Sequence, residues 1–168
     1  EEAGFETDFV DASVGTVKDD MKETFLRAVT QENGLVRIGM SPDSIRRLIA
    51  EGEYDIVAIH SNFTPQSRMV LETARIVREV RPEALIVTGG VNARNMPGYF
   101  LRTGLIDLVC STEGERIIVK IAKEWQRSRS FEGVDGIIFL YSGQLVFRPA
   151  AQGSIVQDLD ELPMPAWS

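Results

Sequence analysis

The chain has 168 residues, of which 43% are hydrophobic, and a formal net charge of −7. This length predicts one domain with an extension. The acidic balance argues against nucleic acid as the main partner, because phosphate binding needs a basic face. No apolar run reaches the length of a membrane span, so no membrane partner is expected. A single cysteine, Cys110, excludes an internal disulfide framework and a cluster site built of cysteines alone, and it favours a reducing cytoplasm.

The first third of the chain has weak patterns. Phe5–Val10 is expected to be a short strand, Asp19–Val29 has helical character, and Leu35–Ile38 is compatible with an extended segment. A clearer helix follows over residues 42–51. Ser41 suits its N-cap and a proline stands at its first position, while a glycine follows its end.

Three apolar runs then alternate with helical patterns. The strands are expected over Tyr54–His60, Ala84–Thr88 and Ile106–Ser111, and the helices over Pro65–Val80, Pro97–Arg102 and Glu115–Gln126. Consecutive strand–helix units of this kind predict a parallel sheet with helices on its faces. The binding site of such a sheet lies at the carboxyl edge of its strands.

The last forty residues have a different pattern. Gly136–Tyr141 and Gln144–Arg148 flank Ser142-Gly143, which predicts a β-hairpin with a two-residue turn. The tail Asp158–Ser168 is acidic and proline-rich and is typical of a linker. The fold class is therefore α/β: a three-layer, mainly parallel open sheet of Rossmann or flavodoxin-like type with a C-terminal hairpin. The expected division is a domain over 1–130, the hairpin extension over 131–157 and the linker over 158–168.

Special residues stand where each of the three strands ends. They are Thr64-Pro65-Gln66, Gly89-Gly90-Val91-Asn92 and Glu113-Gly114-Glu115. Small residues let a ligand approach the backbone, and helix N-termini offer free N–H groups to it. Gly90 is expected to touch the ligand, so that valine at this position should weaken binding.

Each turn also has a purely structural alternative. Thr64 can cap a helix, the glycine pair can serve a tight turn, and Glu113–Glu115 can be a helix start with acids near the positive end of the dipole. Asn92 and Asn95 can organise their loop. These alternatives stay open on the sequence alone.

Two single residues need separate interpretation. His60 ends a strand, and a hydrogen-bonded structural histidine is favoured over a metal ligand. Cys110 is expected to be a buried strand residue, because no neighbouring base activates it. The chain contains no Walker loop and no G-x-G-x-x-G fingerprint. The residues alone therefore predict an α/β domain with a ligand site at the carboxyl edge of its sheet.

The order of these motifs resembles the vitamin B12-binding domain that precedes a radical S-adenosylmethionine (radical SAM) domain in cobalamin-dependent, methyltransferase-like enzymes. The resemblance rests on E-E-A-G-F-E-T-D-F-V-D-A at Glu1–Ala12, Y-D-I-V-A-I-H-S-N-F-T-P-Q at Tyr54–Gln66, L-E-T-A-R-I-V-R-E at Leu71–Glu79, I-V-T-G-G-V-N-A-R at Ile86–Arg94, G-L-I-D-L-V-C-S-T-E-G-E at Gly104–Glu115 and D-L-D-E-L-P-M-P-A-W at Asp158–Trp167. Together these segments cover most of the chain.

The resemblance implies that cobalamin lies on the carboxyl edge with its nucleotide tail beside the sheet. By position, the cofactor-binding residues would be Ser61, Asn62, Phe63 and Thr64 around the tail, Gly89, Gly90 and Val91 under the ligand, and Glu113 and Gly114 at the rim. Corrin amides and a phosphodiester need many neutral donors and acceptors, which suits these loops. No catalytic residue and no metal ligand is assigned, since methyl transfer would belong to the cobalt.

The sequence departs from the family pattern in two ways. The lower-ligand motif D-x-H-x-x-G is absent, which leaves His60 as the only imidazole. If Phe5–Val10 is the family's second strand, the central first strand is missing, and the chain, which begins without Met, is expected to be truncated. Otherwise another chain fills the gap, or Phe5–Val10 is the first strand and Leu35–Ile38 the second.

The chain also lacks the cluster motif C-x-x-x-C-x-x-C. S-adenosylmethionine and a [4Fe–4S] cluster would therefore belong only to a parent enzyme, with a C-terminal radical SAM domain as partner. This chain would be a non-catalytic, cytoplasmic module that holds a corrinoid. The alternative is a flavodoxin-like interaction or regulatory domain that binds no corrin, and a flavin- or nucleotide-binding enzyme is a weaker third.

Overall fold

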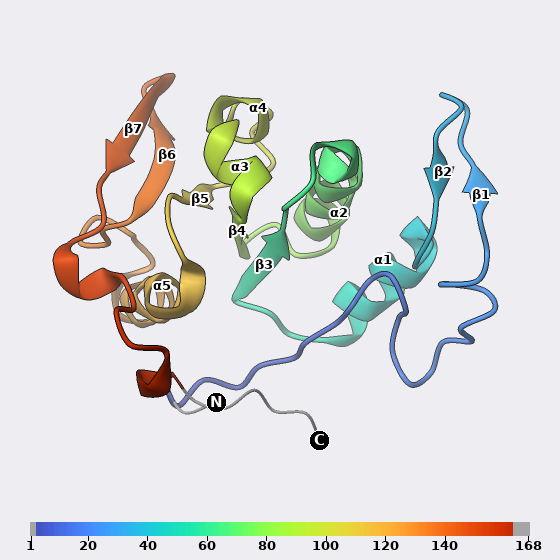
Figure 1. Cartoon of the computed structure of the whole chain (residues 1–168), viewed down its shortest axis with the longest axis horizontal. Coiled ribbons are helices and arrows are strands. Elements are labelled where there is room, and N and C mark those ends of the chain that lie inside the picture. Colours follow the sequence, from blue (N-terminus) through green and yellow to red (C-terminus); the bar gives the residue numbers. More distant parts are fainter. Residues whose placement is uncertain (1–2, 163–168) are drawn as a thin grey trace. The chain divides into compact units, whose positions relative to one another are not determined.

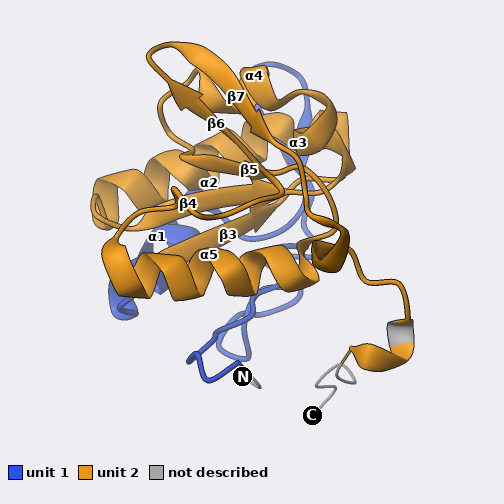
Figure 2. Ribbon diagram, turned by 90° about the vertical axis from the view of Figure 1, so that its left-hand side faces the viewer, with its two compact units in different colours: residues 1, 3–53 blue, residues 2, 54–168 orange. Residues whose placement is uncertain are grey.

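The computed structural model describes residues 3–162 of the chain (Figure 1). It divides into two compact units, coloured separately in Figure 2. Unit 1 comprises Ala3–Glu53 and unit 2 comprises Tyr54–Ser168. The expected boundaries near residues 130 and 157 remain a prediction.

Unit 1 contains little regular structure. Its strands β1 (Val29–Thr30) and β2 (Val36–Arg37) pair antiparallel in a two-stranded ribbon, and α1 spans Pro42–Glu51. The helix begins as predicted: the Ser41 side chain accepts a hydrogen bond from the Ser44 N–H, and proline stands in the first turn.

Two predictions for unit 1 are wrong. Phe5–Val10 forms no strand, and the segment expected to be helical over Asp19–Val29 consists of turns that lead into β1. Asp19 accepts a hydrogen bond from the Thr16 N–H at 2.8 Å, and Asp20 likewise binds the Lys22 N–H at 2.8 Å. Such local side-chain bonds stabilise turns in competition with a helix.

Unit 2 is built on a five-stranded mixed sheet. Its strands are β3 (Ile56–His60), β4 (Leu85–Gly89), β5 (Leu108–Cys110), β6 (Ile137–Tyr141) and β7 (Gln144–Arg148), in that spatial order. The first three strands are parallel neighbours, and β6 and β7 form the hairpin, which joins β5 antiparallel. The predicted fold class is confirmed.

The sheet contains neither Phe5–Val10 nor Leu35–Ile38 among its described strands. The reading in which these two segments supply the first and second strands is therefore wrong. In consequence β3 is an edge strand, although its sequence is as apolar as that of an interior strand.

Helices cover both faces of this sheet. They are α2 (Ser67–Val80), preceded by a 3-10 helix over Thr64–Gln66, α3 (Val91–Asn95), α4 (Pro97–Leu101) and α5 (Gly114–Ser128). Figure 2 shows α5 on one face and α2 on the other. Helix α3 was predicted as a loop, because five residues are too few to display a helical period.

The core under α5 follows the alternation of the strands. Ile117 and Ile121 of α5 are fully buried against Leu85 and Val87 of β4 and the matching residues of β5 and β6. Ile56 of β3 packs against the same cluster, which fixes the side of the sheet that each strand residue faces.

A polar clasp, consisting of Lys120, Asp135 and Ser154, holds the segment after β7 against α5. Lys120 Nζ donates to Asp135 Oδ1 at 2.5 Å and to Ser154 Oγ at 2.5 Å, and the Ala151 N–H donates to Asp135 Oδ2 at 2.6 Å. The hydrogen bonds from Lys120 and Ser154 hold the pKa of Asp135 well below its usual range. The carboxylate thus stays charged and keeps the clasp closed.

Beyond the clasp, Leu159–Glu161 form a short 3-10 helix, and Arg116 of α5 makes an ion pair with Glu161. The prolines and the tryptophan that define the predicted linker lie outside the described residues. The linker therefore stays a prediction.

Candidate functional site at the carboxyl edge

The turns after β3 and β4 meet at the carboxyl edge of the parallel strands. The Ser61 N–H donates to the Gly89 carbonyl at 2.8 Å, and the Asn92 N–H donates to the Ser61 carbonyl at 3.1 Å. The Val91 N–H donates to Asn62 Oδ1 at 3.1 Å. Glu113 and its neighbour Gly114 follow β5 at the same edge of the sheet.

Four polar side chains behind these turns satisfy one another. Asn92 Nδ2 donates to Ser61 Oγ at 2.9 Å and to Ser67 Oγ at 2.9 Å, and Thr64 Oγ1 donates to Asn92 Oδ1 at 3.1 Å. Ser61, Ser67 and Asn92 are buried. Asn92 therefore organises the loop, as one of the two readings predicted, and the side chains of Ser61 and Thr64 hold the turn in shape.

The network also decides the role of Thr64. Its hydroxyl binds Asn92 and caps no helix, since the 3-10 helix begins after Phe63 without a side-chain cap. Ser67 completes the network and was missed by the sequence analysis. Only the contact with Asn92, 25 residues along the chain, distinguishes it from an ordinary helical serine.

The two glycines after β4 differ in what surrounds them. Gly90 has a φ of +96°, and a Cβ placed there would lie 2.5 Å from the Ser61 carbonyl oxygen and 2.7 Å from Asn62 Oδ1. The chain itself therefore requires glycine at this position. A Cβ at Gly89 would meet only the Cβ of Cys110, at an ordinary 3.5 Å.

An open strip of sheet surface lies beside Gly89. The register pairs Ile56 with Leu85 and His60 with Gly89, so alternate residues of β3 and β4 share the face that α5 covers. On this face Ala58 and His60 are exposed, while Leu85 is buried. We call Ala58, His60 and Gly89 the open strip. It is a part of the sheet that α5 leaves uncovered.

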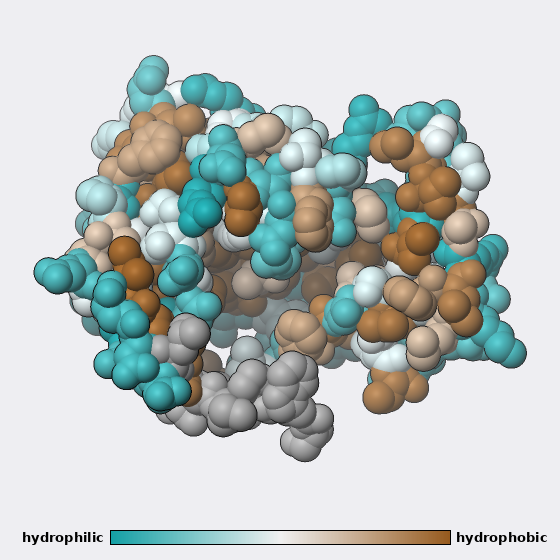
Figure 3. All heavy atoms as spheres, in the orientation of Figure 1, coloured by the Kyte–Doolittle hydropathy of each residue, from teal (hydrophilic) through white to brown (hydrophobic). Residues whose placement is uncertain are grey.

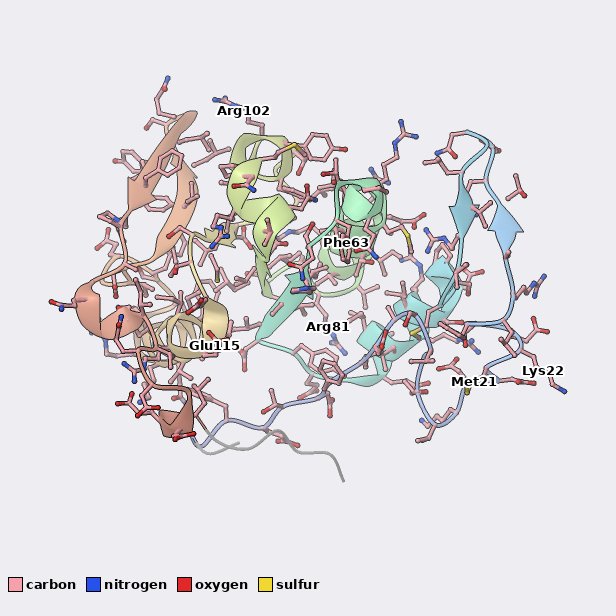
Figure 4. All side chains as sticks on the ribbon, viewed as in Figure 1. Met21, Lys22, Phe63, Arg81, Arg102 and Glu115 are labelled. Atoms are coloured by element: carbon pink, nitrogen blue, oxygen red, sulfur yellow. The ribbon has the colours of Figure 1, made fainter. Side chains whose placement is uncertain are left out.

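The loops above the open strip present apolar and neutral groups. Phe63 is 64% exposed and Val91 is 50% exposed. Figure 4 shows Phe63 in the turn that follows β3 and Glu115 at the start of α5. Glu113 makes no side-chain cap, which leaves the first-turn N–H groups of α5 free of that contact. This edge offers backbone donors and small residues to a large ligand.

The structure changes the interpretation of His60. Its side chain is exposed and forms no hydrogen bond or ion pair with any other described residue. The reading of a hydrogen-bonded structural histidine is therefore wrong.

Cys110 is buried as predicted, and burial raises the pKa of its thiol to about 11. This thiol stays neutral near pH 7.

Residues 3–162 contain no group of three or more His, Cys, Asp and Glu side chains placed to hold a metal ion. Within the same residues no helix combines the length and the apolar character needed to span a bilayer.

Comparison with known proteins gives a family. The B12 binding domain family matches residues 35–122, which is more than half of the chain. The chain is 27% identical to the cytidylyl-2-hydroxyethylphosphonate methyltransferase of Streptomyces wedmorensis, over 83% of this chain and 30% of that protein. It is 30% identical to the anaerobic magnesium-protoporphyrin IX monomethyl ester cyclase of Cereibacter sphaeroides, over 76% of this chain and 21% of that protein.

Solved structures share the fold. The radical S-adenosylmethionine methyltransferase TsrM of Kitasatospora setae, with cobalamin and a [4Fe–4S] cluster bound, superposes with a TM-score of 0.59 at 21% identity, over 66% of this chain and 21% of that one. The cobalamin-dependent S-adenosylmethionine radical enzyme OxsB, with aqua-cobalamin and S-adenosylmethionine bound, gives a TM-score of 0.60 at 21% identity, over 67% and 16%. The chain thus spans less than a third of each of these proteins.

Proposed function

The chain belongs to the B12-binding domain family, and we propose that it is the cobalamin-binding module of a larger radical SAM enzyme. The family match favours this reading over an interaction domain that binds no corrin. Cobalamin, when bound, supplies the methyl-carrying or radical chemistry of its cobalt. The residues of this chain bind and orient the cofactor.

The observation that carries the proposal is the open strip. A sheet strand that is apolar in sequence normally buries both faces, yet Ala58 and His60 of β3 are exposed, and the residue paired with His60 is a glycine. A bulky, flat ligand with a tail fits this surface. The small residues Ala58 and Gly89 leave room over the sheet, and the exposed side chains of Phe63 and Val91 stand in the loops at its carboxyl edge. We assign the tail of cobalamin to this strip.

The predicted site residues then take different roles. Ser61 and Thr64 keep the turn rigid through Asn92, and Gly90 lets the backbones of the two loops approach each other. Gly89 leaves the sheet surface free for the ligand. Asn62, Phe63 and Val91 face the corrin side, and Glu113 and Gly114 border it at the start of α5.

We further propose that the parent enzyme carries its S-adenosylmethionine and [4Fe–4S] cluster in a separate radical SAM domain. The supporting observations are the radical SAM enzymes among the solved structures that share the fold and the absence from this chain of the cysteine motif that would bind a cluster. We place this enzyme in the cytoplasm, since the chain has a single cysteine, which forms no disulfide.

Gly89→Val tests the proposed function. The new Cβ finds ordinary contact, and its two methyl groups extend over the open strip. The unsubstituted chain should retain hydroxocobalamin after desalting, as seen in the visible spectrum. Gly89→Val should bind it about tenfold more weakly or worse, since a steric cost of about 1.4 kcal/mol is a factor of ten.

The matched control is Gly133→Val. Gly133 also lacks a positive φ, a Cβ there has nothing within 4 Å, and it lies outside the site. Its affinity for hydroxocobalamin should be unchanged. Failure of the unsubstituted chain to retain the corrinoid would overturn the proposed function. If a folded Gly89→Val chain binds hydroxocobalamin equally well, the tail does not lie on the open strip.

A further inference from the structure

We infer that His60 is a binding residue for the anionic nucleotide tail of the corrinoid, a role that rests on the proposed function and makes it more specific. His60 is the last residue of β3 and pairs in register with Gly89. Because Gly89 has no side chain, the imidazole borders an unfilled part of the sheet surface. The imidazole of His60 can therefore reach a ligand that lies on the open strip.

The imidazole is free to act on a ligand. It is exposed, and among the described residues it has no hydrogen-bond or ion-pair partner. By contrast, the polar side chains of Ser61, Thr64 and Asn92 are already engaged with one another. His60 is therefore the side chain of the open strip that can donate a hydrogen bond without first breaking one.

Charge identifies the part of the ligand that His60 binds. The phosphodiester of the tail is anionic, whereas the chain has a net charge of −7 and the first turn of α5 carries Glu115. Ala58 and Gly89 offer no side-chain donor. An imidazole N–H is therefore the group on this strip that can donate to the phosphodiester, and hydrogen bonds to charged groups are the stronger kind.

The experiment compares two corrinoids with the 168-residue chain. Hydroxocobalamin has the nucleotide tail, and dicyanocobinamide lacks it. His60→Ala should weaken hydroxocobalamin binding about tenfold, as expected for the loss of a hydrogen bond to a charged acceptor, and should leave dicyanocobinamide affinity within about twofold. His60→Gln retains an N–H donor and should recover most of the lost affinity.

Tyr141→Ala is the control. Tyr141 is likewise the exposed last residue of a strand, but that strand runs antiparallel to β5 and lies outside the site. Its affinity for both corrinoids should be unchanged, and circular dichroism should show that all variants are folded. His60 is exposed, so its replacement should not prevent folding.

The outcomes separate the two proposals. If the unsubstituted chain binds neither corrinoid, the proposed function fails and this inference fails with it. If that chain binds hydroxocobalamin and folded His60→Ala binds it equally well, only the role of His60 is overturned. Equal weakening for both corrinoids would also overturn it, because the contact would then not involve the tail.

Discussion

The two units of the chain differ in how far their apolar side chains are buried. In unit 2, Ile117, Ile121 and Leu108 are completely buried between α5 and the sheet. In unit 1, Phe9 is 93% exposed and Leu26 is 67% exposed. Figure 3 shows apolar side chains gathered at the surface over the β1–β2 ribbon. Unit 1 does bury Met40, Ile45 and Ile49, but many of its other apolar side chains remain exposed.

The difference shows that pattern matters more than composition. The apolar residues of unit 2 recur with the periods of strands and helices, so that each element has one side to bury. In unit 1 such a pattern is confined to α1, where Ile45 and Ile49 are buried. Before α1 the apolar residues fall between turns fixed by aspartates, and the two strands have two residues each. A two-stranded ribbon has marginal stability without further packing.

The strongest test of this contrast is a pair of alanine substitutions. Ile121→Ala should lower the free energy of unfolding by about 3 kcal/mol, because it opens a cavity in the core beneath α5. Val36→Ala in β2 should change it by less than about 0.5 kcal/mol, because Val36 is exposed. Urea titration followed by circular dichroism measures both. A comparable loss for Val36→Ala would show that the ribbon is packed in solution.

A second test concerns the glycines of unit 2. Gly90→Ala should cost about 2 to 3 kcal/mol of unfolding free energy, because the new Cβ would press on the Ser61 carbonyl and the backbone has a positive φ. Gly114→Ala should stay within about 0.5 kcal/mol, since a Cβ there meets nothing within 4 Å. Thermal unfolding of the two variants provides the comparison. An unaffected Gly90→Ala would mean that the two loops do not approach as closely as described.

The smallest expected effect is the dependence of stability on pH at Cys110. Burial raises the folded-state pKa of its thiol from the ordinary 9.0 to about 11. The neutral thiol is therefore favoured in the folded state. The stabilisation that depends on the protonated thiol is complete below pH 9. As the pH rises toward 11 the free energy of unfolding falls by about 2 kcal/mol.

Urea titrations of the unsubstituted chain and of Cys110→Ala at pH 8, 9, 10 and 11 isolate this contribution. The difference in unfolding free energy between the two proteins should narrow above pH 9. A constant difference across the series would place Cys110 in contact with solvent and would contradict its burial in β5.

Much of unit 2 is predictable from the sequence. The runs that became β3, β4 and β5 are bounded by turn residues and followed by helical patterns, and these signals are local. The position of the site at the carboxyl edge follows from the parallel order of the strands. Helix α3 was missed because it is shorter than two turns.

The details of the site depend on contacts distant in sequence. Nothing local shows that Asn92 joins Ser61 to Ser67, or that Gly90 is required by the Ser61 carbonyl and not only by a ligand. The open strip was also not predictable, because the exposure of Ala58 depends on how much of the sheet face α5 covers. The sequence places residues along strands, whereas packing decides which of them stay exposed.

The polar clasp has a mechanical consequence. Lys120 lies in α5, the helix whose first turn borders the carboxyl edge, and Asp135 and Ser154 connect it to the segment that follows β7. Tension applied beyond Ser154 therefore enters the fold at α5, through Lys120, and just before β6, through Asp135, before it reaches β7. A pull on this end of the chain would load the rim of the site, while β7 would carry no load until these hydrogen bonds broke.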